Sequence, residues 1–148
     1  DADAAIKWFR LAAENDEPTA QLGLGLIYLE GRGVDKDAAA AANWLLMAAL
    51  KGEPLAQVNL GMLYLEGRGV EKNAVEAAQW FLRAAEQGNA LAQYHLGLSH
   101  AEGRGVEPDR DEALKWLTMA AEQGLELARD YLTVYLWVSN SLSLETGN

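Results

Sequence analysis

The chain has 148 residues, half of them hydrophobic, a composition that suits one folded unit with a continuous core rather than a disordered segment. Its formal net charge of −10 disfavours nucleic acid or anionic lipid as the main ligand and favours a partner with a basic patch. There is no cysteine, so disulfides and thiolate metal sites are excluded. The longest apolar runs are too short to span a bilayer, so membrane insertion is not expected.

A hexapeptide that recurs at a fixed distance organises the chain. The sequence Leu-Glu-Gly-Arg-Gly-Val stands at 29–34 and 65–70, and 101–106 differs from it only in the first residue. The offset is 36 residues each time, a period typical of stacked-repeat proteins. We call a set of positions 36 residues apart a column. Tryptophan fills one column without a slip, at Trp8, Trp44, Trp80 and Trp116.

The first predicted element is a helix from Asp3 to Asn15, since its apolar residues recur at helical spacing. By its column positions it is the second helix of a repeat whose first helix lies outside the chain, so we expect the chain to be a piece of a longer protein. Asp16 then occupies a column that is otherwise glycine. Glycine there suits the left-handed residue that ends a helix, and aspartate tolerates this conformation less well.

Each later repeat is predicted to open with a first helix, over 18–30, 54–66 and 90–102. Pro18 and Pro54 suit the first helical position. Glycine inside these helices costs about 1 kcal/mol relative to alanine, so its recurrence at one column predicts close approach of a neighbouring helix. The glycines of that column are Gly25, Gly61 and Gly97.

Each Gly-Arg-Gly-Val segment is predicted to be a short connection, in which the first glycine supplies positive φ and ends the helix. The second helix is predicted to follow N-caps at Asp37, Asn73 and Asp109. Asn73 with Glu76 and Asp109 with Glu112 predict capping boxes. The tryptophan of each second helix is predicted to be buried.

The pattern lapses near the end of the chain. Ala128 and Leu132 keep the register, but Thr133 replaces the glycine and no Gly-Arg-Gly-Val follows. The segment is predicted to be an unusually apolar helix, either a cap or a surface that further chain covers, and we favour the second. Its candidates for end-to-end contact are Tyr135, Leu136 and Trp137.

The repeated pattern is Ala-x-x-x-Leu-Gly-x-x-Tyr-x-x-Gly-x-Gly-Val, then Ala-x-x-Trp-x-x-x-Ala-Ala-x-x-Gly, as between Ala56 and Gly88. It resembles the Sel1-like repeat, a relative of the tetratricopeptide repeat. The resemblance implies an all-α fold, a right-handed α/α superhelix (solenoid) of antiparallel helix pairs, and an adaptor or scaffold role in protein complexes, most often in bacteria. Family habit points to the bacterial envelope, periplasm or cytoplasm, and the sequence leaves the localisation open.

This pattern divides the chain into parts of one solenoid domain. Residues 1–17 form the second helix of a truncated repeat, 18–53, 54–89 and 90–124 are full repeats, and 125–148 are an irregular helix and tail. First helices line the concave face of such solenoids. The positions between the core columns, which vary from repeat to repeat, are therefore predicted to bind a partner. They are Leu22, Leu26, Val58, Asn59, Met62, Tyr94, His95 and Leu98. For Leu26 and Leu98, packing between helices is an equal alternative.

The function predicted from these features is a protein-interaction scaffold that binds a partner protein or peptide in the concave groove. The alternative is a structural module that self-associates through its exposed ends. A glycan- or cell-wall-related binding protein or enzyme has less support, because no acid–base pair or nucleophile motif is present. His95 and His100 are five residues apart and do not share a helix face as metal ligands would. No catalytic, metal or cofactor site is predicted.

Overall fold

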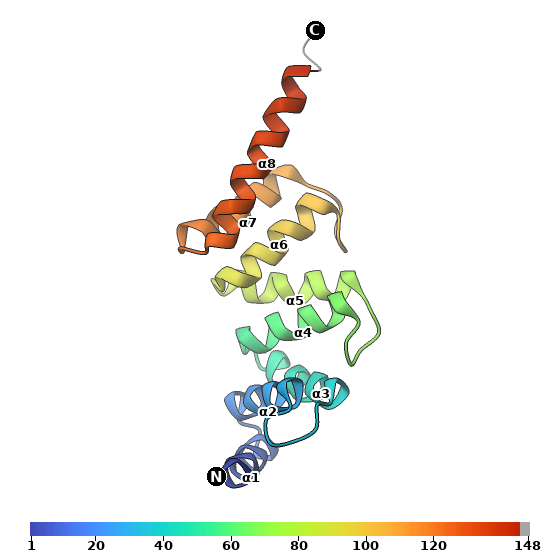
Figure 1. Ribbon diagram of the computed structural model, residues 1–148, viewed down its shortest axis with the longest axis vertical. Helices are drawn as coiled ribbons and strands as arrows, with labels where there is room; N and C mark the ends of the chain where they lie inside the picture. Colours follow the sequence, from blue (N-terminus) through green and yellow to red (C-terminus); the bar gives the residue numbers. More distant parts are fainter. Residues whose placement is uncertain (146–148) are drawn as a thin grey trace.

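The computed structural model describes residues 1–145, which form eight α-helices and no strand. The helices follow one another along the long axis of the molecule, with the two ends of the chain far apart (Figure 1). Each helix packs mainly on its neighbours in the chain, which confirms the predicted succession of helix pairs. The helices are α1 (Ala2–Glu14), α2 (Pro18–Glu30), α3 (Ala38–Leu50), α4 (Pro54–Glu66), α5 (Ala74–Glu86), α6 (Ala90–Glu102), α7 (Arg110–Glu122) and α8 (Glu126–Glu145).

The second helices α3, α5 and α7 begin at the predicted caps. The side chains of Asp37, Asn73 and Asp109 each accept a hydrogen bond from the backbone N–H three residues on, at 2.9, 3.1 and 3.0 Å. Each bond satisfies one of the N–H groups that a helix start leaves without a partner.

Only one of the two hydrogen bonds of each predicted capping box forms, the one that the N-cap side chain accepts. The backbone N–H groups of Asn73 and Asp109 donate to the carbonyl oxygens of Tyr64 and His100, at 2.9 and 3.0 Å. The preceding helix therefore provides the acceptor that the glutamate of a capping box would supply. Glu112 instead accepts a hydrogen bond from Trp116 Nε1 at 3.0 Å.

The column of helical glycines is where the two helices of a repeat come closest. A Cβ added at Gly25, Gly61 or Gly97 would lie 2.6 or 2.7 Å from a side chain of the following second helix, closer than real Cβ atoms approach. The predicted close approach is confirmed. The side chains met are those of Leu45, Phe81 and Leu117 respectively.

The second glycine of the connection joins one repeat to the one before it, a role that the sequence did not reveal. A Cβ at Gly69 or Gly105 would lie 2.1 or 2.0 Å from the carbonyl oxygen of Ala38 or Ala74, at the start of the preceding second helix. Both glycines also have positive φ, 70° and 73°. Any side chain here would separate adjacent repeats.

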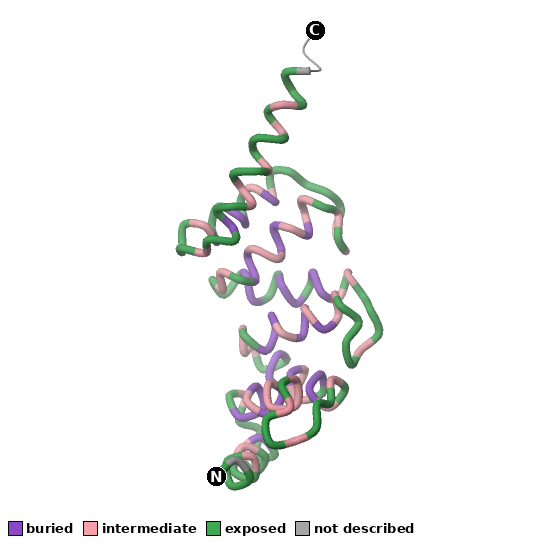
Figure 2. The backbone as a smooth tube through the Cα atoms, in the orientation of Figure 1, coloured by how far each residue is buried: buried purple, intermediate pink, exposed green. Residues whose placement is uncertain are grey.

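Burial is concentrated from α2 to α7, whereas α1 and the far half of α8 are mostly exposed (Figure 2). The tryptophan column follows the same trend. Trp80 and Trp116 are 4% and 7% exposed, Trp44 is half-buried, and Trp8 is 72% exposed. The prediction that this column is buried is wrong for Trp8, because α1 packs to any extent only on α2.

A buried glutamine near the start of each first helix ties its repeat to the preceding one. Nε2 of Gln21, Gln57 and Gln93 donates to the backbone carbonyl eight residues earlier, at 3.1, 3.1 and 3.3 Å. Oε1 of Gln57 and Gln93 accepts a bond from Nε2 of Gln87 and Gln123, at 2.9 and 2.8 Å. The side-chain amides of Gln57 and Gln93 therefore each donate one hydrogen bond and accept another.

Lys51 stands in the column of Gln87 and Gln123 and makes a different contact. Its Nζ lies 2.9 Å from Oδ1 of Asp16 and 2.6 Å from the Asp16 carbonyl oxygen. Oε1 of Gln21 consequently has no partner among the described residues. The Lys51 hydrogen bond, then its charge, lowers the pKa of Asp16, which takes the left-handed conformation of its glycine column with φ 66°.

Gly69→Ala should destabilise the chain by about 3 kcal/mol or more, because the methyl group adds a clash with Ala38 to the left-handed strain. Gly88→Ala is the matched control. It has a φ of 89° and nothing within 4 Å of an added Cβ, so strain alone should cost about 1–2 kcal/mol. Urea unfolding of both variants checks this, and equal losses would contradict the contact between repeats.

Gln87→Ala should lower the free energy of unfolding by about 1–2 kcal/mol, although Gln87 itself is exposed, because it leaves the buried Oε1 of Gln57 unsatisfied. Gln79→Ala, at an exposed glutamine on α5, the helix that Gln87 follows, should change stability by less than about 0.5 kcal/mol. Thermal and urea unfolding measure both. Equal free energies of unfolding for the two variants would show that the hydrogen bond between Gln87 and Gln57 contributes nothing to stability.

Candidate functional site

One face of the first helices stays accessible through the whole stack. On α4, Leu55, Asn59, Met62 and Glu66 follow each other at four, three and four residues, a spacing that places them on one face. All four are exposed or half-buried. We call these four columns the first-helix stripe. Its other members are Thr19, Gly23, Leu26 and Glu30 on α2, Leu91, His95, Leu98 and Glu102 on α6, and Leu127, Tyr131, Val134 and Val138 on α8.

The first row of the stripe is a line of exposed leucines. Leu55, Leu91 and Leu127 are 50%, 37% and 54% exposed. They are not among the residues predicted from the sequence to bind a partner, although they form a leucine column outside the core columns. Large apolar side chains that are exposed at the same position of successive helices mark an interaction surface better than scattered ones do.

The second row, which we call the middle row because it lies between the two apolar rows, is the most variable. It reads Gly23, Asn59, His95 and Tyr131 from α2 to α8, so both side-chain volume and hydrogen-bonding capacity change along the stack. The third row is apolar throughout, with Leu26, Met62, Leu98 and Val134. A polar and aromatic row thus runs between two apolar rows.

The structure divides the eight residues that the sequence predicted for partner binding. Leu22 and Val58 are only 9% and 3% exposed and pack in core clusters, so their expected place on an accessible surface is corrected. In these two repeats the position faces the neighbouring helices, whereas Tyr94, in the same column, is half-buried. The other six are half-buried and partly accessible: Leu26, Asn59, Met62, Tyr94, His95 and Leu98.

An aromatic ladder connects α5, α6 and α8. Phe81 and His95 are stacked with ring centroids 4.9 Å apart, and His95 lies 5.3 Å from Tyr94. Tyr94 meets Tyr131 edge-on at 6.5 Å, and Tyr131 stacks on Tyr135 at 5.8 Å. The sequence placed Tyr135 with the end-contact residues, whereas the structure makes it a half-buried part of this ladder.

Two members of the ladder have shifted pKa values. Burial, followed by the charge of Arg104, lowers the pKa of His95 against the opposing effect of Glu66. Burial, followed by the charge of Glu102, raises the pKa of Tyr131, whose hydroxyl donates to the Glu102 carboxylate at 3.4 Å. Both rings are therefore neutral near pH 7.

The fourth row carries a carboxylate in each full repeat. Glu66 pairs with Arg68 at 3.3 Å, and the same pairing joins Glu102 to Arg104. These side chains are substantially exposed, and such pairs contribute little to stability. A charged partner can therefore compete for them.

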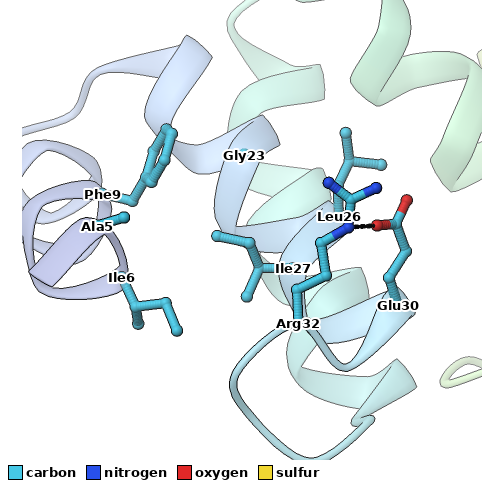
Figure 3. Close-up of a pocket in the computed structure, with 8 residues that line it drawn as sticks. All are labelled: Ala5, Ile6, Phe9, Gly23, Leu26, Ile27, Glu30 and Arg32. Carbon is cyan, nitrogen blue, oxygen red and sulfur yellow. Dashed lines mark ion pairs between the residues drawn. The ribbon is translucent and has the colours of Figure 1, made fainter. Parts of the chain in front are cut away.

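A cavity of about 390 Å³ lies between α1 and α2, at the N-terminal end of the stripe. Gly23 leaves room here, and the Phe9 ring lies against it, 2.9 Å from where a Cβ would stand. Figure 3 shows the ion pair of Glu30 and Arg32 beside this space. The lining residues are Ala5, Ile6, Phe9, Gly23, Leu26, Ile27, Glu30 and Arg32.

The other predicted surface lies on α8. Leu136 is 40% exposed and Trp137 is 70% exposed, so both are available for contact. Among residues 1–145, no group of three or more His, Asp or Glu side chains is arranged to hold a metal ion. Within the same range, no helix has the length and apolar character needed to cross a membrane.

Comparison with known proteins identifies the repeats. The model of the Sel1 repeat matches residues 1–17, 18–53, 54–89 and 90–125. Among solved structures, the chain is similar to a protective antigen with an SLR fold, present in uropathogenic Escherichia coli strains. The TM-score is 0.87 and the identity 45%, over 89% of this chain and 28% of the antigen, so the chain spans less than a third of that protein.

Two further structures agree with this match. A Sel1 repeat protein from Oxalobacter formigenes has a TM-score of 0.79 and 39% identity, over 87% of this chain and 97% of that one. Cysteine rich protein B from Helicobacter pylori has the same fold, with a TM-score of 0.69 and 24% identity over 88% of this chain and 94% of that one. No functionally curated protein matches significantly. With repeats matched from residue 1 to 125, the chain belongs to the Sel1 repeat family of α/α solenoid proteins.

Proposed function

We propose that this chain is a non-catalytic interaction module that binds a partner polypeptide along the first-helix stripe, on the concave side of the solenoid. Sel1 repeats generally act as protein-interaction modules and are typically not catalytic. The observation that carries the proposal is the row of exposed leucines, Leu55, Leu91 and Leu127, repeated on three successive first helices. None of these three leucines belongs to a core cluster.

The middle row favours an extended partner segment over a helical one. Asn59, His95 and Tyr131 offer hydrogen-bonding groups between two apolar rows. Asn59 Nδ2 donates to the Leu55 carbonyl at 2.7 Å, which leaves its Oδ1 to accept from a partner N–H. An extended segment has free backbone groups and side chains that alternate to either side, whereas the backbone of a helix is already satisfied.

Charge favours a basic partner. The chain carries a net charge of −10, and the exposed carboxylates of Glu66 and Glu102 form the fourth row of the stripe. Complementary charge raises the rate of association and discriminates among partners more than it raises affinity. The apolar rows would then supply most of the binding energy.

Replacing two leucines of the first row, Leu55→Ser with Leu91→Ser, should weaken partner binding by about ten-fold or more, since both lose apolar contact at the centre of the surface. The control pair is Val75→Ser with Leu82→Ser, which are 52% and 39% exposed on the second helix α5. Partners captured from a lysate of the source organism are identified by mass spectrometry, and their affinities are then measured with each purified variant.

Circular dichroism melting must show that both pairs of substitutions leave the chain folded. The control should bind as the unmodified chain does. If the Leu55 and Leu91 variant binds with unchanged affinity while folded, the first-helix stripe is not the working surface.

Self-association through α8 is a second candidate function, favoured by the 70% exposure of Trp137 and the 40% exposure of Leu136. Sedimentation velocity over a range of concentrations should then show a dimer that Trp137→Ser abolishes, because the indole would be the main buried group. A chain that sediments as a monomer at every concentration would remove this candidate.

A further inference from the structure

The tyrosine pair on α8 consists of Tyr131, a member of the stripe, and Tyr135, which lies beside the stripe in the column of Leu63 and Ser99. Tyr131 and Tyr135 lie one helical turn apart, with ring planes 23° from parallel and centroids 5.8 Å apart. Tyr94 approaches Tyr131 edge-on, at an angle of 82°. The hydroxyl of Tyr131 donates to Glu102, which fixes the ring and places a carboxylate beside it. Both tyrosines are half-buried and therefore still accessible.

Two tryptophan rings of this fold are covered by the protein's own cations. The Arg83 guanidinium lies 4.4 Å above the Trp80 ring, and Lys115 Nζ lies 4.7 Å above Trp116. Within residues 1–145, no Lys or Arg of the chain lies over Tyr131 or Tyr135 in this way. Ring faces attract cations through their quadrupole, most strongly where water is partly excluded.

The neighbouring basic side chains are engaged elsewhere. Arg104 pairs with Oε2 of Glu102, while the Tyr131 hydroxyl uses Oε1. Arg129, although next but one to Tyr131, directs its Nε to the Ala121 carbonyl at 3.3 Å. Within residues 1–145, the ring faces of the tyrosine pair therefore carry no cation of the chain, while the carboxylate beside them already pairs with Arg104.

We propose that Tyr131 and Tyr135 receive an arginine side chain of the bound partner, with its guanidinium against the tyrosine rings and close to Glu102. This inference rests on the proposed function, because Tyr131 ends the middle row along which the partner segment lies. Arginine fits better than lysine because a planar, weakly hydrated guanidinium extends a stack of rings. It also donates several hydrogen bonds in one plane, and the Glu102 carboxylate, whose oxygens each accept more than one bond, can receive one beside Arg104 and Tyr131.

The test uses N-acetyl-arginine amide as the probe and N-acetyl-citrulline amide as its uncharged counterpart of the same shape. Binding is followed by the ring NMR signals of Tyr131 and Tyr135. The arginine probe should shift them saturably, and the citrulline probe should bind at least about three-fold more weakly, in keeping with an accessible cation–π contact.

Variants locate the probe. Tyr135→Leu should weaken arginine binding at least about three-fold, whereas Tyr135→Phe should retain it because the ring face remains. Trp137→Leu, at an exposed ring on the same helix, should have no effect. Equal binding of both probes, an unchanged affinity in Tyr135→Leu, or a loss in Trp137→Leu would each overturn the proposal.

The outcome is separable from that of the proposed function. If the Leu55 and Leu91 variant loses the partner while Tyr135→Leu binds the arginine probe with unchanged affinity, the interaction surface is kept and the arginine site is removed. If Tyr135→Leu weakens arginine binding while the Leu55 and Leu91 variant binds the partner normally, the arginine site is kept and the interaction surface is removed.

Discussion

The contact between the two helices of a repeat, at the glycines where no Cβ fits, sets the geometry of the whole molecule. Gly25, Gly61 and Gly97 let a side chain of the following helix sit directly on the backbone of the first. A contact of this closeness permits little change in rotation or translation of one helix against the other. The glycine and the side chain that packs on it are therefore arranged alike in all three full repeats.

This fixed rotation separates the residues that fold the chain from those that can specialise. Leu22 and Val58 face the neighbouring helices and are buried, while the residues one position further along, Gly23 and Asn59, reach the accessible face. The middle row can therefore change from glycine to asparagine, histidine and tyrosine without loss of the core contacts beside it. A stack of nearly identical units acquires a surface that differs along its length.

The parts of this structure that the sequence predicts depend on local signals. The helix starts at Asp37 and Asn73 and the left-handed backbone at Asp16 follow from residue type and from column position. The misplaced Leu22 and Val58 show the limit of such reasoning. One residue along a helix is a rotation of about 100°, and the boundary between core and surface depends on where the next repeat lies.

Contacts between repeats were beyond the sequence for the same reason. Gly69 looked like one more turn residue, and only its distance to Ala38 shows that it lets two repeats meet. Trp8 matches its column in sequence, yet its exposure depends on which helices pack on α1. Residues of one column share a type and a place in the repeat, whereas the burial of each depends on the helices that pack on it.

The last helix follows from this constraint in a different way. Thr133 takes the place of the packing glycine in α8, so a second helix at the spacing found in the other repeats would meet its side chain. Of the four first helices, α8 is thus the one whose sequence is not adapted to the close pair. It also brings a tyrosine to the stripe, Tyr131, with a second tyrosine, Tyr135, stacked on it. α8 thus lacks the glycine of the close helix pair, and its stripe residues differ most from those of the other first helices.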